Sequence, residues 1–367
     1  MKLEAALQGP DRRAVPAPPI SFFEFWPGWL FYTPVMAHCL LMALRHGSAT
    51  ALTAANPSIP GGGLCGESKL DILDQIGPTA RPLVAPYTSL RTDGSGLQTD
   101  IAEAETRLKE AALTYPVVAK PDIGCNGTGV RLIEGSSDLV RYLSGFPRGE
   151  RVILQEYIPL ENEAGLFYIR HPEEAQGRIT SVTLKHAPFV IGDGRSTLRE
   201  LILADPRAGR VSHLYLPRLT NRLREVPQAG EKVRLVFVGN HCKGSIFENG
   251  SDHATPELTA AAERIARSMP NFHFGRIDLR FDSIAALRRG EGFRVIEING
   301  VGSEATHVWD PRTTLWDAWR AQFFHYGEAY RIGAANRRNG VRATPVRDLL
   351  RLWRLQRRLM RAYPIND

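Results

Sequence analysis

A glycine-rich loop between two predicted strands constrains the fold of this chain more than any other feature. Apolar and β-branched residues at 115–120 and 130–133 are typical of strands, and Lys120 ends the first of them. The loop between the strands carries Gly124, Gly127 and Gly129. Backbone N–H groups of such a loop can approach an anion closely, and the lysine supplies a positive charge for phosphate. The segment therefore predicts either a phosphate-binding strand pair or a purely structural turn.

Two familiar nucleotide-binding motifs are excluded by the residues around this loop. A P-loop ends in Gly-Lys-Ser or Gly-Lys-Thr directly before a helix, and this loop contains no such run. A dinucleotide fingerprint needs a helix after its glycines, whereas residues 130–133 are predicted to form a strand. A nucleotide site at this loop must therefore belong to another fold.

Two segments further along the chain alternate charged and apolar residues with the period of a strand. Arg276, Asp278 and Arg280 share one face of the first segment, and Glu297 and Asn299 share one face of the second. If the two strands are neighbours, Asp278, Glu297 and Asn299 bring oxygen ligands together, which suits Mg²⁺ bridging nucleotide phosphates. The alternative is a solvent-exposed sheet face with ordinary charges.

The remaining pattern predicts an α+β fold. Strands are predicted at 152–157, 165–170, 179–184, 232–238, 276–281 and 293–298, and helices at 68–75, 99–113 and 256–267. Because strands and helices do not alternate strictly, a doubly wound parallel sheet is not favoured. The composition, with 43% hydrophobic and 23% charged residues, excludes a disordered chain. The four cysteines form no CxxC pair, so neither a zinc site nor a redox dithiol is indicated.

Together these motifs resemble the ATP-grasp superfamily, in particular its carboxylate–amine ligases such as D-alanine–D-alanine ligase. The match runs from about Ser68 to Asp310, and the motifs occur in the order of the family. The resemblance implies two α+β sub-domains that clasp ATP, here 68–160 with the glycine-rich loop and 161–330 with the metal site. The ends depart from the family, because residues 1–67 form a short, atypical, aromatic-rich region and residues 331–367 form a basic tail.

By motif position, the resemblance implies three groups of site residues. ATP would be held by Lys69, Lys120, the loop glycines Gly124, Gly127 and Gly129, the hinge Gln155, Glu156, Tyr157 and Ile158, and Glu163 at the ribose. Two Mg²⁺ ions would be held by Asp278, Glu297 and Asn299. Arg276 would stabilise the acyl-phosphate and the tetrahedral oxyanion, helped by backbone N–H groups around Gly302.

A second resemblance covers residues 185–202, which are similar to a segment of cyanophycin synthetase and related glutamate-using ligases. Gly192-Asp-Gly194 predicts a tight turn, and Thr197 with Glu200 predicts a capping box that opens a short helix. The resemblance implies that Lys185 and Arg195 reach the γ-phosphate or an acidic substrate.

The implied activity is amide ligation of the acid–amino-acid type. A small-molecule or peptide carboxylate would form an acyl-phosphate with ATP, and an amine would then displace phosphate, releasing ADP and phosphate. One rival interpretation is a small-molecule kinase built on the same grasp, which consumes no amine. The other is a non-catalytic, nucleotide-binding scaffold at a membrane surface. Nucleic acid is not an expected partner.

The two ends of the chain bear on its location. Residues 331–367 carry ten arginines against Asp348 and Asp367, a charge of +8, whereas the net charge of the whole chain is +7 and residues 1–330 therefore sum to −1. With Trp353 and leucines between the arginines, the tail predicts a basic amphipathic helix that docks on the body or contacts an anionic membrane. The uncharged stretch 25–44 predicts a helix from Pro34 to His46, about 20 Å long and too short to span a bilayer. Because no signal pattern opens the sequence, we expect a cytoplasmic protein, and the sequence leaves open whether its tail docks on the body or associates with a membrane.

Overall fold

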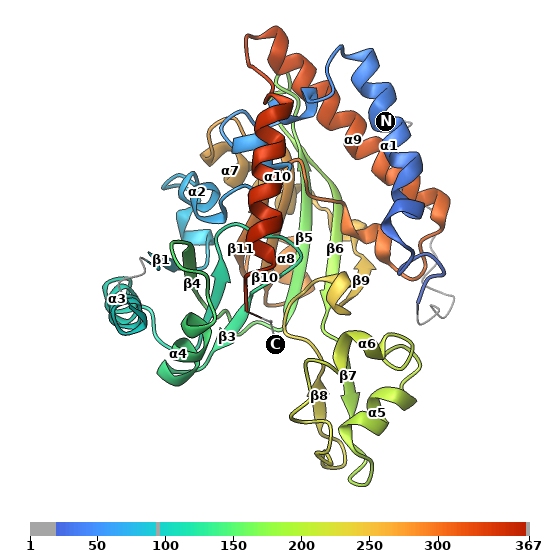
Figure 1. Cartoon of the computed structure of the whole chain (residues 1–367). Coiled ribbons are helices and arrows are strands. Elements are labelled where there is room, and N and C mark those ends of the chain that lie inside the picture. The colour runs from blue at the N-terminus through green and yellow to red at the C-terminus, as the bar shows by residue number, and fades with distance from the viewer. Residues whose placement is uncertain (1–19, 93–95, 365–367) are drawn as a thin grey trace.

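Two antiparallel sheets form the framework of the molecule (Figure 1). The computed structural model describes residues 20–92 and 96–364. The smaller sheet has the strand order β1-β4-β2-β3, with β1 at Tyr87–Arg91, β4 at Arg151–Glu156, β2 at Val117–Pro121 and β3 at Arg131–Ile133. The larger sheet has the order β11-β10-β5-β6-β9, with β11 at Phe293–Asn299, β10 at Phe274–Phe281, β5 at Asn162–Ile169, β6 at Arg178–His186 and β9 at Ile246–Asn249.

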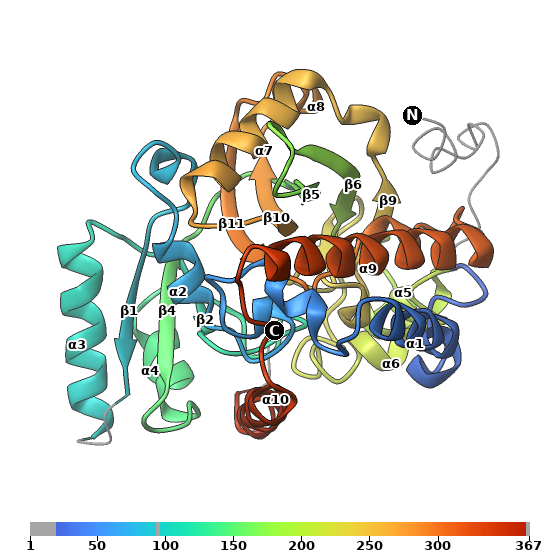
Figure 2. The ribbon, with the colours of Figure 1, turned by 90° about the horizontal axis from the view of Figure 1, so that it is seen from above.

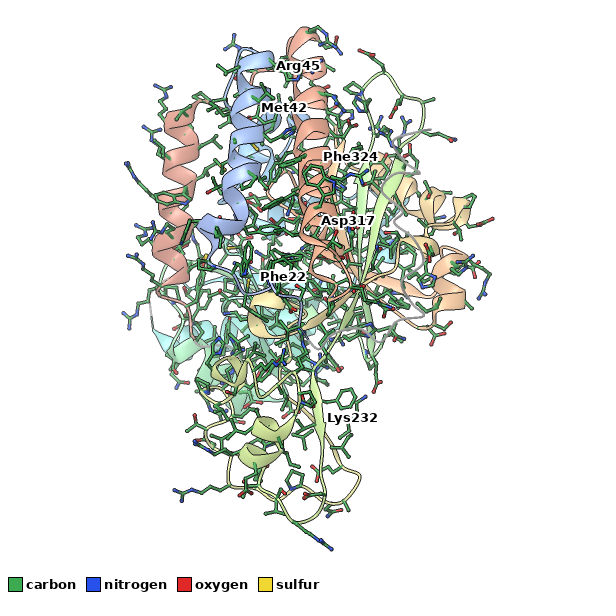
Figure 3. The ribbon with its side chains drawn as sticks, turned by 90° about the vertical axis from the view of Figure 1, so that its right-hand side faces the viewer. Phe22, Met42, Arg45, Lys232, Asp317 and Phe324 are labelled. Carbon is green, nitrogen blue, oxygen red and sulfur yellow. The ribbon has the colours of Figure 1, made fainter. Side chains whose placement is uncertain are left out.

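Helices cover both faces of the larger sheet (Figure 2). One face carries α7 (Pro256–Ser268) and α8 (Ile284–Arg288), whereas the long helix α9 (Leu315–Arg338) lies across the other. The buried side chains of β5 and β10 alternate between these two layers, since Leu166 and Ile277 pack towards α7 and Phe167 and Phe274 pack towards α9. The outer helix α1 (Gly28–Arg45) lies beside α9 (Figure 3).

The smaller sheet has a core of its own. Helices α3 (Leu97–Glu110) and α4 (Ser136–Ser144) pack on it, and the cluster includes Val117, Leu139 and Leu154. The last helix, α10 (Val346–Met360), adds Leu359 to this cluster. A separate small lobe contains the strand pair of β7 (Phe189–Ile191) and β8 (Lys232–Arg234) with α5 (Leu198–Ala204) and α6 (Ser212–Tyr215).

The α+β class and several local predictions are confirmed. Strands β10 and β11 are antiparallel neighbours, with Asp278 opposite Glu297. The capping box is present, since the Thr197 side chain accepts from the Glu200 backbone and the Glu200 side chain accepts from the Thr197 backbone. Helix α2 (Lys69–Asp74) begins as predicted after Ser68, whose hydroxyl accepts from the Asp71 N–H.

The prediction for the N-terminal helix was wrong about its start. The sequence predicted a start at Pro34, but helix α1 begins at Gly28 and contains Pro34. The Thr33 hydroxyl donates to the Trp29 carbonyl one turn earlier, as it does inside a helix. Phe31, which is 1% exposed, packs in the core from the turn before Pro34, so the helix starts earlier than this residue. Within the described residues, no helix is both long enough and apolar enough to cross a membrane.

Candidate active site

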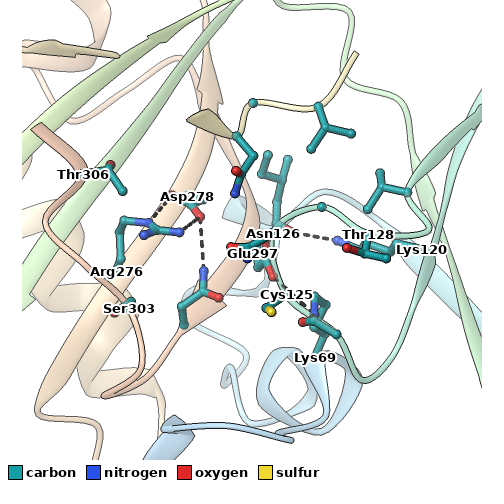
Figure 4. A pocket seen from close by; sticks show the side chains of 18 of the residues that line it. Lys69, Lys120, Cys125, Asn126, Thr128, Arg276, Asp278, Glu297, Ser303 and Thr306 are labelled. Carbon is teal, nitrogen blue, oxygen red and sulfur yellow. Dashed lines mark hydrogen bonds and ion pairs between the residues drawn. The ribbon is translucent and has the colours of Figure 1, made fainter. Parts of the chain in front are cut away.

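A cavity of about 530 Å³ lies between the two sheets, and it collects nearly all of the predicted site residues. Figure 4 shows Arg276 and Asp278 on one side and Lys120 and Lys69 on the other. The predicted residues that line it are Lys69, Lys120, Gly124, Gly127, Gln155, Glu156, Tyr157, Ile158, Glu163, Lys185, Arg276, Asp278, Glu297, Asn299 and Gly302. Gly129 lies at the base of the loop, with a positive φ of 74° and with Pro121 and Tyr363 too close for a side chain.

Lys120 projects from β2 and is held at the floor of the cavity. Its ammonium donates to Gln155 Oε1 at 2.8 Å and to the Ile296 carbonyl at 2.9 Å, so it joins the two sheets. Burial lowers the pKa of Lys120 to about 8, although the Glu297 carboxylate acts in the opposite direction. The ammonium is therefore held by neutral oxygens, and its charge is available to an anion in the cavity.

The glycine-rich loop follows β2 and is anchored by the start of α2. Lys69 donates to the Gly124 carbonyl, and its ammonium lies 3.7 Å from Glu297 Oε1. The loop turns through Asn126 and Gly127, whose φ angles of 55° and 65° lie in the left-handed region that favours glycine and asparagine. Thus Lys69 and Lys120 stand on either side of a loop whose backbone lines the cavity.

Four charged side chains form a buried network on the opposite wall. Lys185 donates to Glu163 Oε1 and to Asp278 Oδ1, both at 3.0 Å. Arg276 binds Asp278 through two hydrogen bonds, Nε to Oδ1 at 2.8 Å and Nη2 to Oδ2 at 2.9 Å. Burial alone would raise the pKa of Asp278, but the two cations outweigh it and hold the pKa at about 2. Asp278 is therefore ionised, and it fixes the Arg276 guanidinium in the cavity wall.

The predicted metal ligands lie on the neighbouring strands β10 and β11. The Asn299 side chain donates through Nδ2 to Asp278 Oδ2 at 3.1 Å, so its side-chain oxygen takes no part in this hydrogen bond. Glu297 forms an ion pair with Lys69. Among the residues that the structure describes, no three His, Cys, Asp or Glu side chains gather closely enough to form a metal site by themselves. The set therefore consists of two carboxylates and one amide oxygen on one wall.

The predicted hinge joins β4 to β5, and an arginine orders its backbone. Arg280 donates to the carbonyls of Ile158 at 2.9 Å and Leu160 at 3.2 Å, and its guanidinium lies over the Tyr157 ring. The sequence pattern placed Arg280 on the same face of β10 as Asp278, but it did not predict that Arg280 binds the hinge. The Gln155 side chain binds Lys120 and the Ala85 carbonyl, so its amide serves the protein interior.

Two of the groups predicted to stabilise anions have other hydrogen-bond partners in this structure. The N–H of Gly302 donates to the Gly63 carbonyl at 2.6 Å, so it is not free to bind an oxyanion; a side chain here would meet the Leu64 carbonyl. Arg195 lies exposed in the turn before α5 in the small lobe, where its backbone binds Asp193, and it does not line the cavity. Its distance from the cavity follows from the length of β6 and the position of the lobe, which no local motif encodes.

Several cavity residues were missed because they come from distant parts of the chain. Tyr32 of α1 donates to Glu304 Oε1 at 2.6 Å, and Gln322 of α9 donates to the same oxygen at 3.0 Å. Gln356 of α10 accepts from the Gly66 N–H at 2.5 Å and donates to Cys125 Sγ at 3.2 Å in the glycine-rich loop. The sequence signals an amphipathic tail but gives no sign that it contacts this loop.

No protein-family model matches the sequence. Cyanophycin synthetases from Trichormus variabilis and a Nostoc species are 25% identical to it over 217 residues, which is 53% of this chain and 23% of each relative. The chain thus spans less than a quarter of the length of these curated relatives. The resemblance to cyanophycin synthetase that the motifs predicted is confirmed.

Three solved structures with detectable similarity are synthetases or ligases by name. The D-alanine–D-alanine ligase from Bacillus anthracis has 14% identity and a TM-score of 0.39, covering 76% of this chain and 68% of that one. The D-Ala:D-Ser ligase from Enterococcus faecalis has 13% identity and a TM-score of 0.38, with coverages of 72% and 60%. A bifunctional glutathione synthetase from Pasteurella multocida has 17% identity and a TM-score of 0.33, with coverages of 70% and 35%.

Proposed function

We propose that this chain is an ATP-dependent ligase of the ATP-grasp type, and that it joins a carboxylate to an amine as an acid–amino-acid ligase. One observation carries the proposal: the glycine-rich loop, the Lys120 ammonium and the Arg276–Asp278 pair all face one cavity. Its volume of about 530 Å³ lies within the range of small-molecule sites, roughly 300–1,000 Å³. The curated relatives and the order of the motifs support the same class of reaction.

The nucleotide would lie with its phosphates between the two walls. Lys120 and Lys69 supply positive charge from one wall and Lys185 from the other, while the loop at 124–129 offers backbone N–H groups. The base would lie at the hinge, where Arg280 holds the backbone of Ile158 and Leu160 in place. In such an enclosed site, fixed charges act more strongly than they do in water.

The site would take two Mg²⁺ ions together with the nucleotide, and they would supply positive charge toward its phosphates. Asp278, Glu297 and Asn299 are the residues that would hold them, and their oxygen atoms are the hard ligands that Mg²⁺ prefers. Because Mg²⁺ keeps several waters and phosphate oxygens, a set of two carboxylates and one amide is sufficient. The donor set thus fits the ion.

The reaction would begin when the substrate carboxylate attacks the γ-phosphorus, giving ADP and an acyl-phosphate. Arg276 is positioned to neutralise the acyl-phosphate and the later tetrahedral oxyanion, because Asp278 fixes its guanidinium through two hydrogen bonds. An amine then displaces phosphate and forms the amide. The loop at 124–129 would exclude water from the acyl-phosphate while the amine enters.

An assay with hydroxylamine tests this function without knowledge of the natural amine. The protein is incubated with ATP, MgCl₂, hydroxylamine and each member of a panel of amino acids and short peptides, and hydroxamate, ADP and phosphate are measured. We expect equimolar ADP, phosphate and hydroxamate, and at least a 100-fold loss in the Asp278→Asn, Glu297→Gln double variant. Glu291→Gln, at a side chain that is 69% exposed, is the matched surface control.

Three outcomes of this assay would refute the ligase function. They are release of AMP and pyrophosphate, full activity of the double variant, and failure of every carboxylate in the panel to give hydroxamate. A phosphorylated hydroxyl product formed without any hydroxamate would identify the kinase alternative instead.

We further propose that the protein contacts an anionic membrane through α10 and α1, which lie on the same side of the larger sheet (Figures 1 and 2). Outward on α1 lie Trp29, Met36, Leu40 and Leu44, which are 63–73% exposed although large and apolar. On α10 the arginines Arg347, Arg351 and Arg358 are 71–80% exposed. Apolar side chains beside arginines match the interface of a negatively charged bilayer, where each arginine contributes about 1 kcal/mol.

Liposome sedimentation tests the membrane contact. We expect binding to phosphatidylglycerol vesicles and much less to phosphatidylcholine vesicles. Changing Met36, Leu40 and Leu44 to Ser should abolish binding, whereas Leu203→Ser, at an apolar residue of the small lobe that is 48% exposed, should not change it. Equal sedimentation of both variants, or none of the wild-type protein, would end this proposal.

A further inference from the structure

One carboxylate in the cavity is not used by the proposed phosphate chemistry. Glu304 lies after β11, and its side chain lines the cavity. Its Oε1 accepts from Tyr32 Oη at 2.6 Å and from Gln322 Nε2 at 3.0 Å. These donors belong to α1 and α9, so three segments far apart in the sequence fix this carboxylate in one position.

Glu304 has no cationic partner among the residues that the structure describes. The nearby Arg276 directs its Nε and Nη2 to Asp278, and its Nη1 donates to the backbone carbonyl of Glu304 at 3.1 Å instead of to the carboxylate. Burial raises the pKa of Glu304, and neither its neutral donors nor the charge of Arg276 reverses that shift. An enclosed carboxylate held only by neutral groups is unfavourable unless a cation reaches it from the cavity.

Aromatic side chains line the cavity near Glu304. Tyr32 and Trp309 line this end of the cavity, and the His241 ring stacks on Trp309 with a centroid distance of 4.4 Å and an interplanar angle of 7°. Burial lowers the pKa of His241 to about 4, so the imidazole is neutral at pH 7 and does not repel a cation. Aromatic faces attract ammonium groups by cation–π interaction. This end of the cavity therefore has the chemistry of a site for a cationic amine.

The geometry assigns Glu304 as the group that binds the amine substrate as its ammonium ion and accepts a proton from it. The assignment rests on the proposed ligase function and names the substrate class of that site: a primary amine that enters as its ammonium ion. The hydrogen bond between Arg276 Nη1 and the Glu304 carbonyl sets the amine site beside the arginine that would hold the acyl-phosphate.

The step balances in protons and bonds. The ammonium gives one proton to the Glu304 carboxylate, and the freed nitrogen lone pair attacks the acyl carbon. The bond between that carbon and the phosphate oxygen breaks, the nitrogen loses its second proton to the departing phosphate, and one N–H stays in the amide. Tyr32 and Gln322 act as positioning residues, because they hold Oε1 in place.

Competition between two small probes tests the assignment. Hydroxylamine is neutral at pH 7 and reports the acyl-phosphate, while n-butylammonium chloride is a cationic amine and n-butanol is its uncharged counterpart. We expect n-butylammonium, but not n-butanol, to suppress hydroxamate formation by the wild-type protein with a carboxylate found by the hydroxylamine assay. In Glu304→Gln the inhibition constant of n-butylammonium should rise at least tenfold relative to the wild type. Glu304→Asp should keep the inhibition, and Glu291→Gln should behave as wild type.

Each result has a distinct meaning. Equal inhibition of the wild type and of Glu304→Gln, or no inhibition of the wild type, overturns the amine site while the ligase function stands. Absence of hydroxamate from the wild type refutes the ligase function, and the amine site with it.

Thermal unfolding separates a ligand-binding role from a structural one. Because the raised pKa means that the ionised carboxylate is unfavourable in the fold, Glu304→Gln should unfold at a higher temperature than the wild type at pH 7. A residue that served only to join α1 and α9 would give a lower unfolding temperature when changed, and that outcome also overturns the assignment.

Discussion

Helix α10 provides the most direct test of how this molecule is held together. It docks through Leu359, which is 3% exposed, and through Tyr363, whose hydroxyl donates to the Ile123 carbonyl at 2.7 Å. Replacing a buried leucine by alanine costs about 2–5 kcal/mol. Because a terminal helix can settle into the gap, we expect the lower part of that range, about 2–3 kcal/mol, for Leu359→Ala. Since about 1.4 kcal/mol is a factor of ten in an equilibrium constant, α10 should undock roughly 30–150 times more often.

Trypsin measures this opening, because its cleavage sites are the arginines of α10 itself. At low trypsin concentration, reclosing is faster than cleavage, and the cleavage rate follows the open population. Leu350→Ala is the matched control: it makes the same chemical change in the same helix at a side chain that is 44% exposed. It should alter the rate less than about threefold. Mass spectrometry identifies fragments that end within α10. The rate at which they appear gives the ratio of cleavage rates between variant and wild type, and the absolute docking free energy is not needed.

The reasoning fails if Leu359→Ala and Leu350→Ala are cleaved at the same rate within a factor of three. A second readout links docking to the site. Gln356 holds the Gly66 N–H and Cys125 only while α10 is docked, so Leu359→Ala should also raise the KM for ATP.

Three further outcomes follow from single contacts. Burial lowers the pKa of Lys120 to about 8, so this ammonium loses its proton between pH 7 and pH 9 and ATP affinity measured by titration should fall over that interval. Lys120→Arg should show little change in ATP affinity over the same interval. In α9, Gly333→Ala places a Cβ 1.9 Å from the Ala51 carbonyl and should lower the urea midpoint of unfolding. Gly327→Ala meets no atom closer than 3.5 Å and should raise the free energy of unfolding by about 0.5–1 kcal/mol, and equal shifts of the two variants would contradict this. Arg207→Met leaves the buried Glu24 carboxylate without its ion pair and should cost about 3–5 kcal/mol of unfolding free energy, which Glu24→Gln in the same chain should largely restore.

The parts of the site that lie on regular strands could be predicted from the sequence. Side chains of a strand alternate between its two faces, so the pattern at 276–281 places Arg276 and Asp278 on one face regardless of the rest of the fold. Once β10 and β11 pair, their register puts Glu297 opposite Asp278. Local side-chain chemistry also sufficed at Thr197, where the capping box depends on residues three positions apart.

The failures came where packing outweighed local signals. Thr33 and Pro34 have the chemistry of a helix start, yet α1 continues through them because Phe31 is buried on the preceding turn. Glu304, Tyr32 and Gln322 share no spacing in the sequence, and only the position of α1 beside α9 brings their side chains together. The same is true of Gln356, whose contact with the glycine-rich loop depends on where the last helix docks.

The network on the wall opposite Lys120 has a consequence for how anions would enter the site. Lys185 and Arg276 balance Glu163 and Asp278, so the four charges sum to zero and are shielded from water. An entering phosphate group would replace Asp278 as the counter-ion of Lys185. Because Lys185 is already buried, little water would have to leave its ammonium group. Since buried charges are screened weakly by dissolved salt, this share of the affinity should persist at ionic strengths that abolish binding to an exposed basic surface.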